Sequence, residues 1–159
     1  MTLNEPDDIR KAYGCFATGV AIATTVGADG QRVGMTISSF NSVSLDPPLV
    51  LWSLQNNSDV YDVFARPRYF AINVLASEQE GLSNQYARKG QHGLDAAHYR
   101  AGKYGAPIVR DALVSFECEL YATHEGGDHL IIVGRVHDMH SRPDGAPLLF
   151  YGGAYRELA

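Results

Sequence analysis

Small hydroxyl and amide side chains gather in two clusters along the chain. The first spans residues 35–44 and carries Thr36 in a run that alternates apolar with small or polar residues. The second spans residues 53–58 and ends at Ser58. Hydroxyls and free backbone N–H groups of this kind bind a phosphate or the polar edge of a heterocycle, and a helix starting near Ser58 adds its N-terminal amides. The alternative interpretations are a turn rich in Ser and Asn and a simple helix cap.

Histidines and cysteines give weaker chemical signals. His129 follows a Gly-Asp turn, where an isolated histidine is usually a structural hydrogen-bonding residue. His137 and His140 lie three residues apart on a predicted strand, so alternation would point them to opposite faces, and we expect no metal site. Cys15 and Cys118 lack Cys-x-x-Cys spacing and are expected to be buried thiols. No Ser-His-Asp arrangement or convincing pair of a general acid and a general base is present.

The composition is that of an ordinary globular protein. The 159 residues suit a single domain over residues 1–159, with 45% hydrophobic and 19% charged residues. A net charge of -5 gives no general attraction for nucleic acid or anionic lipid. The acidic start of the chain lacks the basic and apolar regions of a signal peptide, and no apolar stretch approaches about 18 residues. These features predict a cytoplasmic protein with no nucleic-acid or membrane partner.

Hydrophobic periodicity predicts strands along most of the chain. The expected strands lie at residues 20–26, 33–37, 49–54, 69–75, 113–124, 130–140 and 148–151. Three short helices are expected: one carrying Ile9, Tyr13 and Phe16, one capped by Asn57 or Ser58, and one with a capping box between Ser77 and Glu80. Residues 88–111 lack sustained periodicity and are predicted to form a long functional loop.

This element order favours a mainly β fold. The strands are joined mostly by turns, and the helices are too few for βαβ alternation, so we expect an antiparallel sheet that closes into a barrel. The chain has no G-x-G-x-x-G motif. A bound nucleotide would therefore be held by something other than the Rossmann arrangement.

Several segments, taken in order, resemble the short-chain flavin reductase family, from Phe16 almost to Leu158. Members adopt an FMN-binding split β-barrel of the antiparallel, Greek-key type, and many serve as the reductase component of two-component flavin monooxygenases. The segments that carry the resemblance are Phe16-Ala17-Thr18-Gly19-Val20, Gly34-Met35-Thr36-Ile37-Ser38-Ser39-Phe40, Val43-Ser44-Leu45-Asp46-Pro47-Pro48-Leu49-Val50, Phe70-Ala71-Ile72-Asn73-Val74-Leu75, Gly127-Asp128-His129 and Tyr151-Gly152-Gly153-Ala154-Tyr155.

The resemblance implies a set of site residues. Those that line the flavin ring and ribityl chain would be Thr36, Ile37, Ser38, Ser39, Ser53, Leu54 and Gln55. Those near the flavin phosphate would be Ser58, Ala87 and Arg88, although Arg88 also suits a solvated surface charge. His129 would be the catalytic residue, beside the flavin face where the nicotinamide stacks. Tyr151 and Tyr155 would close over the cofactors, and the alternative for both is packing or dimer contact.

The resemblance further implies an NAD(P)H:flavin oxidoreductase that passes hydride from NADH or NADPH to FMN or FAD. We expect a homodimer that supplies reduced flavin to an oxygenase component. The alternative is an FMN-binding electron carrier without efficient nicotinamide turnover, and a third hypothesis is a flavin-independent binding module. The residues do not decide between FMN and FAD or between NADH and NADPH, and loop 88–111 is the segment that we expect to influence the choice of flavin.

Overall fold

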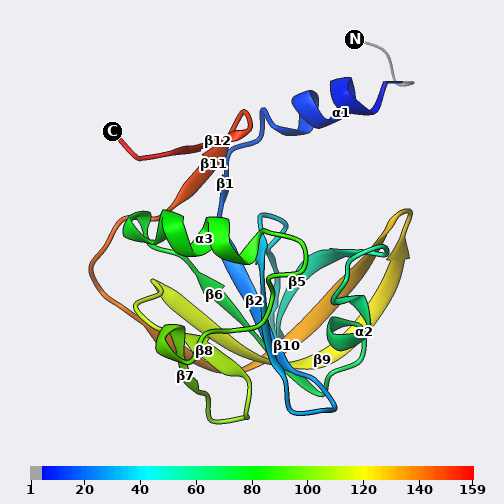
Figure 1. The fold of residues 1–159 in the computed structure, drawn as a ribbon, viewed down its shortest axis with the longest axis vertical. Coiled ribbons are helices and arrows are strands. Elements are labelled where there is room, and N and C mark those ends of the chain that lie inside the picture. Colours follow the sequence, from blue (N-terminus) through cyan, green and yellow to red (C-terminus); the bar gives the residue numbers. More distant parts are fainter. Residues whose placement is uncertain (1–4) are drawn as a thin grey trace.

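Seven antiparallel strands form the main sheet of the computed structural model, which describes residues 5–159 (Figure 1). Their order across the sheet is β3-β2-β6-β9-β10-β5-β4. The strands are β2 (Ala21–Val26), β3 (Arg32–Ile37), β4 (Asn41–Leu45), β5 (Pro48–Gln55), β6 (Tyr69–Val74), β9 (Val114–Gly126) and β10 (His129–Ser141). The predicted mainly β, antiparallel fold is confirmed.

The sheet curves into a barrel that is split between its first and last strands. Within the described residues, β3 and β4 are the two ends of the hydrogen-bonded order, and residues 38–40 cross the gap between them. The Ser39 hydroxyl accepts a hydrogen bond from the backbone N–H of Ser53 on β5, at 2.9 Å. This linking segment is therefore tied to the last hairpin of the sheet.

Smaller elements surround the main sheet. Strands β1 (Thr18–Gly19), β11 (Leu149–Tyr151) and β12 (Ala154–Arg156) form a three-stranded sheet, which together with helix α1 (Pro6–Tyr13) makes an arm that projects from the barrel (Figure 1). Strands β7 (Tyr99–Ala101) and β8 (Pro107–Val109) form a hairpin. The remaining helices are α2 (Tyr61–Phe64) and α3 (Glu80–Tyr86), with 3-10 turns at Ser77–Gln79 and Ala96–His98. In the described part of the chain, no helix combines the length and the apolarity needed to cross a lipid bilayer.

Strand β2 is buried on both faces because two hydrophobic cores meet across it. Ala21 and Ala23 belong to the core inside the barrel, where Trp52 is fully buried and packs against Phe64 at a ring-centroid distance of 5.2 Å. Ile22 belongs to a second core beneath α3. Alternate residues of β2 thus enter different cores. For this reason the strand lacks the solvent-exposed polar face that an alternating pattern would give.

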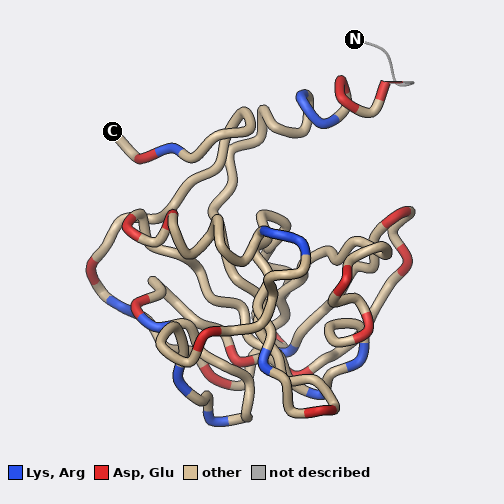
Figure 2. The backbone as a smooth tube through the Cα atoms, viewed as in Figure 1, with Lys and Arg blue, Asp and Glu red and all other residues tan. Residues whose placement is uncertain are grey.

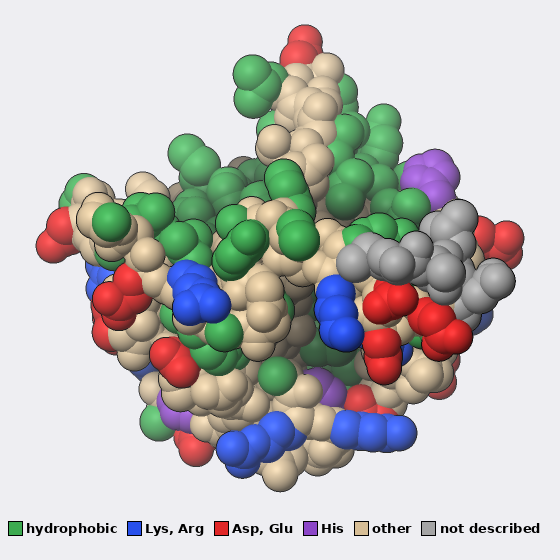
Figure 3. Space-filling view, turned by 90° about the horizontal axis from the view of Figure 1, so that it is seen from above, with side chains coloured by type: hydrophobic (Ala, Val, Ile, Leu, Met, Phe, Trp, Pro, Cys, Tyr) green, Lys and Arg blue, Asp and Glu red, His purple; other side chains and the backbone are tan. Residues whose placement is uncertain are grey.

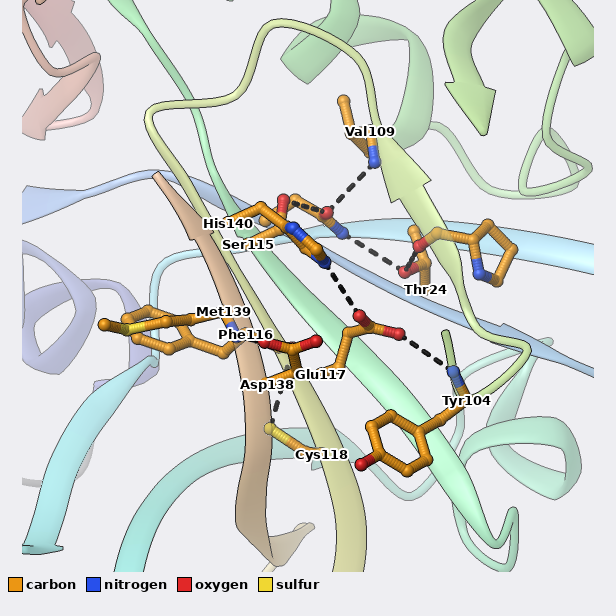
Figure 4. Close-up of polar contacts among 12 residues, drawn as sticks. Thr24, Tyr104, Val109, Ser115, Phe116, Glu117, Cys118, Asp138, Met139 and His140 are labelled. Carbon is orange, nitrogen blue, oxygen red and sulfur yellow. Dashed lines mark hydrogen bonds and ion pairs between the residues drawn. The ribbon is translucent and has the colours of Figure 1, made fainter. Parts of the chain in front are cut away.

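A buried polar network fixes the β7–β8 hairpin against the outer face of the sheet (Figure 4). The Asn73 side-chain oxygen accepts hydrogen bonds from the Val109 backbone N–H, at 3.0 Å, and from the Ser115 hydroxyl, at 2.7 Å. Its amide nitrogen donates to the Ile22 carbonyl at 2.9 Å. Because every Asn73 group has a partner, burial of this amide carries no unsatisfied polar cost.

The structure corrects several predictions about local elements. Residues 88–111 are not one long loop, since they contain β7 and β8. Residues 92–94 also pair with β3: the Gly34 N–H donates to the His92 carbonyl at 2.8 Å, and the Leu94 N–H donates to the Arg32 carbonyl at 2.9 Å. Strands of three residues are too short to show a period of two. Strand β12 was not predicted for the same reason, and β4 was not predicted because its residues form part of the polar hydroxyl cluster.

The predicted helix ends are only partly right. The capping box between Ser77 and Glu80 is wrong: a 3-10 turn precedes α3, and the Gln79 side chain accepts from the Ala76 N–H at 3.0 Å. The Ser58 hydroxyl accepts from the Val60 N–H, one residue before α2 begins, so it orders the approach to the helix. Helix α1 is present but buries none of its residues.

The prediction of two buried thiols is correct for Cys118 and wrong for Cys15, which is exposed. Cys118 provides a test of the packing. It is 1% exposed on β9, and burial raises the pKa of its thiol to about 12. At mildly alkaline pH only a small fraction of Cys118 is therefore in the reactive thiolate form, and the surrounding core shields it from reagents. In a Cys15→Ala variant, which removes the exposed thiol, we expect no reaction of the folded protein with a thiol reagent such as DTNB, and one thiol per chain after unfolding in guanidinium chloride. Fast reaction of the folded variant would contradict this packing.

Candidate functional site

A pocket of about 290 Å³ opens between β3, the end of β5 and the segment that follows α3; we call it the β3–β5 pocket. Its lining residues are Met35, Thr36, Gln55, Asn57, Ser58, Asp59, Ala87, Lys89 and His92. Four of them, Thr36, Gln55, Ser58 and Ala87, are predicted site residues. They come from three separate segments of the sequence, so the fold brings the two hydroxyl and amide clusters together.

Hydrogen bonds place α3 beside the first cluster. The Thr36 hydroxyl donates to the Ser83 carbonyl at 2.6 Å, which holds α3 against β3. Because α3 ends at Tyr86, the next residue, Ala87, reaches the pocket wall. The second cluster follows β5, whose last residue is Gln55. Positions alternate in both strands, so Ile37 and Leu54 are buried in the barrel core while their neighbours Thr36 and Gln55 line the pocket.

The wall formed by residues 89–92 is closed by an ionisable pair. His92 is 6% exposed; its Nδ1 donates to the Gly34 carbonyl at 3.1 Å, and its Nε2 lies 3.2 Å from the Asp59 carboxylate. Asp59 also accepts from the Gly90 N–H at 2.6 Å. The carboxylate of Asp59 is thus already paired with groups of residues 90–92. Lys89, which has no salt bridge within residues 5–159, supplies a positive charge to the pocket.

His129 does not line the pocket, but strand pairing connects it to one of the lining residues. It lies directly across from Gln55 in the β5–β10 ladder, and the Asn56 N–H donates to the Asp128 carbonyl at 2.9 Å. His129 Nδ1 donates to the Asp128 carboxylate at 2.6 Å. This hydrogen bond is the main reason that the pKa of Asp128 is lowered. Asp128 therefore orients the ring, which remains about one third exposed, with a side-chain exposure of 35%.

The other predicted residues are placed apart from the β3–β5 pocket. Ser38 lines a separate hollow of about 50 Å³, and Ser39 bonds the Ser53 backbone as described above. Arg88 is exposed and does not line the pocket. Tyr155 contacts α3, with its hydroxyl 2.6 Å from the Ser83 hydroxyl. Tyr151 lies on the arm and is 44% exposed.

Five lining residues were not among the predicted ones: Met35, Asn57, Asp59, Lys89 and His92. Met35 and Asn57 lie inside the two clusters that the sequence does show. Asp59 directly follows Ser58, but a carboxylate repels a phosphate, so the sequence offers no reason to place it in the site. Its partners, His92 and the Gly90 N–H, are seen only in the structure. Lys89 and His92 belong to residues 88–111, where only tertiary contacts show which side chains face the pocket.

The prediction that His137 and His140 point to opposite faces of the strand is wrong. A bulge in β10, between Val136 and Asp138, leaves His137 without a cross-strand partner and resets the alternation. His137 Nε2 lies 2.8 Å from Glu119, and His140 Nε2 lies 2.8 Å from Glu117, on one face of β9. Glu117, Asp138 and His140 place their ligand atoms within 4.8 Å of one another. His140 and Glu117 already bond each other, so this geometry is accounted for without an ion.

The site geometry fits a flavin nucleotide. The hydroxyl of Ser58 and the ammonium group of Lys89 suit a phosphate, and Thr36 and Gln55 offer polar groups for a heterocycle edge. The pocket alone is small for a whole flavin mononucleotide. A bound flavin would therefore extend beyond it, toward the edge where His129 lies.

Comparison with known proteins agrees with this geometry. A protein-family model described as a flavin reductase like domain matches residues 13–159. The FMN reductase (NADH) SmoA of Agrobacterium fabrum is 44% identical over 146 residues, which cover 92% of this chain and 82% of SmoA. The reductase component of the flavin-dependent trigonelline monooxygenase of Acinetobacter baylyi is 39% identical; the match covers 96% of this chain and 49% of that protein, so the chain spans about half of its length.

Solved structures give the same result. The NADH:FAD oxidoreductase SgcE6 of Streptomyces globisporus, solved in complex with NAD and FAD fragments, superimposes with a TM-score of 0.94 at 32% identity. The alignment covers 100% of this chain and 96% of SgcE6. Both the length of the family match and the fold likeness therefore lead to one conclusion: the chain belongs to the flavin reductase like domain family.

Proposed function

We propose that the chain is an NAD(P)H:flavin oxidoreductase that reduces FMN or FAD bound at the β3–β5 pocket. The observation that carries the proposal is the convergence of Thr36, Gln55, Ser58 and Ala87, from three segments, on one pocket that also holds Lys89. The flavin supplies the redox chemistry, since its ring accepts hydride from a reduced nicotinamide. The task of the protein is to bind and align the two molecules.

The chain's own groups divide this task. Ser58 and Lys89 offer a hydroxyl and a cation to the flavin phosphate. Gln55 and Thr36 would contact the ring edge, although the Thr36 hydroxyl already donates its proton to the Ser83 carbonyl. His129, hydrogen-bonded to Asp128 and paired with Gln55, would contact the nicotinamide beside the flavin ring. Arg88 remains a predicted contact of the flavin phosphate. Tyr151 and Tyr155 remain predicted to close over the bound cofactors.

Supply of reduced flavin to an oxygenase is part of the proposal. The trigonelline relative is named as the reductase component of a monooxygenase, and SmoA is named as an NADH-dependent enzyme. These names favour NADH as donor and a separate oxygenase as consumer of reduced flavin. The electron-carrier alternative predicts flavin binding without rapid reduction by a nicotinamide nucleotide.

A homodimer is also part of the proposal, because apolar side chains are exposed around the arm. Seen from above, on the face from which the arm projects, hydrophobic side chains gather over one side of the molecule (Figure 3). The exposed large residues of the arm and of β4 are Tyr13, Phe16, Val43, Leu45, Tyr151 and Leu158, with Leu45 96% exposed. β4 is also an end strand of the sheet. Burial between two copies would remove this apolar surface from water.

Two further predictions stay attached to the proposal. We propose that residues 1–159 act as one domain, which is supported by the family match over residues 13–159. We also propose a cytoplasmic location. The two cysteines are free thiols, which favours a reducing compartment.

The reaction is tested by anaerobic stopped-flow absorbance at the oxidised flavin band. Protein loaded with FMN or FAD is mixed with NADH or NADPH, and we expect rapid bleaching because the site aligns nicotinamide and flavin. NADH is the expected donor. Demonstrated flavin binding without bleaching by either nucleotide would contradict the reductase and favour the electron carrier.

The phosphate role of Lys89 is tested with two flavins. Loss of the charge in Lys89→Gln should raise the Kd for FMN about tenfold, since a charge-assisted hydrogen bond contributes about 1.5–3 kcal/mol. Binding of riboflavin, which has no phosphate, should be unchanged. Lys103→Gln is the matched control, because Lys103 lies in the β7–β8 hairpin. Equal weakening of FMN and riboflavin would show that Lys89 acts on the pocket shape and not on the phosphate.

The dimer is tested by sedimentation velocity. A Leu45→Glu substitution places a charge in the proposed interface and should shift the wild-type dimer to monomer. Tyr121→Glu is the control, since Tyr121 is 54% exposed on β9, outside the arm and β4. A monomeric wild type, or a dimer that both variants leave intact, would be incompatible with this interface.

A further inference from the structure

A second hollow, of about 210 Å³, lies beside the β7–β8 hairpin and shares no residue with the β3–β5 pocket. Three arginines line it: Arg100 on β7, Arg110 after β8 and Arg142 after β10. We call it the arginine hollow. Figure 2 shows several Lys and Arg positions around this hairpin and the segment that follows β10, with Asp and Glu positions among them. The concentration is notable in a chain whose net charge is -5.

The positive charge of the arginine hollow is only partly neutralised. Arg142 forms a salt bridge with Glu78, at 2.8 Å. Arg100 and Arg110 form none with the residues that the structure describes, although Asp111 also lines the hollow. Guanidinium groups around one hollow repel one another. A bound anion removes that repulsion, and the planar guanidinium fork matches the oxygens of phosphate or carboxylate.

Arg142 adds an unused donor. Its Nε is buried and finds no hydrogen-bond acceptor among residues 5–159. A buried donor without an acceptor costs about 1–3 kcal/mol, so native proteins rarely leave one unpaired. Since this Nε is shielded from solvent, an oxyanion in the hollow would bind the other guanidinium nitrogens of Arg142, and it would reach the Nε only after a movement of the side chain.

The floor of the hollow is rigid. His140 lines it, and its Nε2 donates to Glu117 at 2.8 Å (Figure 4). Glu117 is 1% exposed and also accepts from the Tyr104 N–H at 3.1 Å, so the imidazole is held in place from behind. Ser115, another lining residue, is fixed by its bond to Asn73. A preorganised wall lowers the entropic cost of binding a ligand.

We propose that the arginine hollow binds a phosphate-type oxyanion, either free phosphate or the phosphate group of a small phosphomonoester. Arg100, Arg110 and Arg142 would hold its oxygens, with His140 in the wall behind them. The site is separate from the β3–β5 pocket and does not depend on the flavin reductase proposal.

Isothermal titration of the flavin-saturated full-length chain tests the proposal. The probes are inorganic phosphate and glycerol 2-phosphate, at an ionic strength held constant with chloride, and FMN absorbance checks that neither displaces the flavin. We expect one saturable site in the wild type. In Arg100→Gln/Arg110→Gln the affinity should fall at least about tenfold, because charged hydrogen bonds contribute about 1.5–3 kcal/mol each.

The matched control is Arg66→Gln/Arg135→Gln, which removes two arginines that are exposed like Arg100 and Arg110 but lie outside the hollow. It should leave the affinity within about twofold, because neither residue can contact an anion bound there. Tighter binding of glycerol 2-phosphate than of phosphate would identify a phosphomonoester as the ligand class, and the reverse order would identify free phosphate. Absence of saturable binding in the wild type, or equal losses in the two double variants, would overturn the proposal. A rise in the wild-type Tm with phosphate that the hollow variant lacks is the independent readout.

Discussion

The pairing of β5 with β10 is the constraint on which the candidate flavin site depends. Its register is set by the core, because Val50, Trp52 and Leu54 must all enter the barrel interior. A slip of one residue would turn these side chains to the other face, so hydrophobic burial allows one register. That register places His129 opposite Gln55. Packing of apolar side chains thus determines the position of a polar residue more than seventy positions away in sequence.

The same coupling of core and site operates at β3. Ile37 enters the barrel core, which leaves Thr36 facing α3 and the β3–β5 pocket. The bond from Thr36 to the Ser83 carbonyl fixes the helix, and the second core, with Ile22 and Tyr86, holds it from below. Ala87 therefore reaches the pocket as a consequence of how α3 packs.

The two end strands of the split sheet, β3 and β4, differ in how their outer edges are covered. Residues 92–94 pair with β3, and the contact of His92 with Asp59 secures this segment as a wall of the β3–β5 pocket. The exposed edge of a sheet invites association with other chains, and this cover removes one such edge. β4 has no comparable cover among the described residues, and its Leu45 is almost fully exposed. One edge thus forms part of the site, while the other offers an apolar surface for association.

The sequence by itself determined the mainly β class, the long strands and the two polar clusters, because these depend on local periodicity and residue type. The ordered segments from Phe16 to Leu158 were enough to identify the family. Tertiary structure decided which members of each cluster face the pocket, since that depends on strand register. It also decided that Lys89, His92 and Asp59 line one pocket, where the contact of His92 with Asp59 joins segments about thirty residues apart. A bulge in β10 places His137 and His140 on the same face. Neither register nor a bulge leaves a clear pattern in a single sequence, because both result from packing between distant strands.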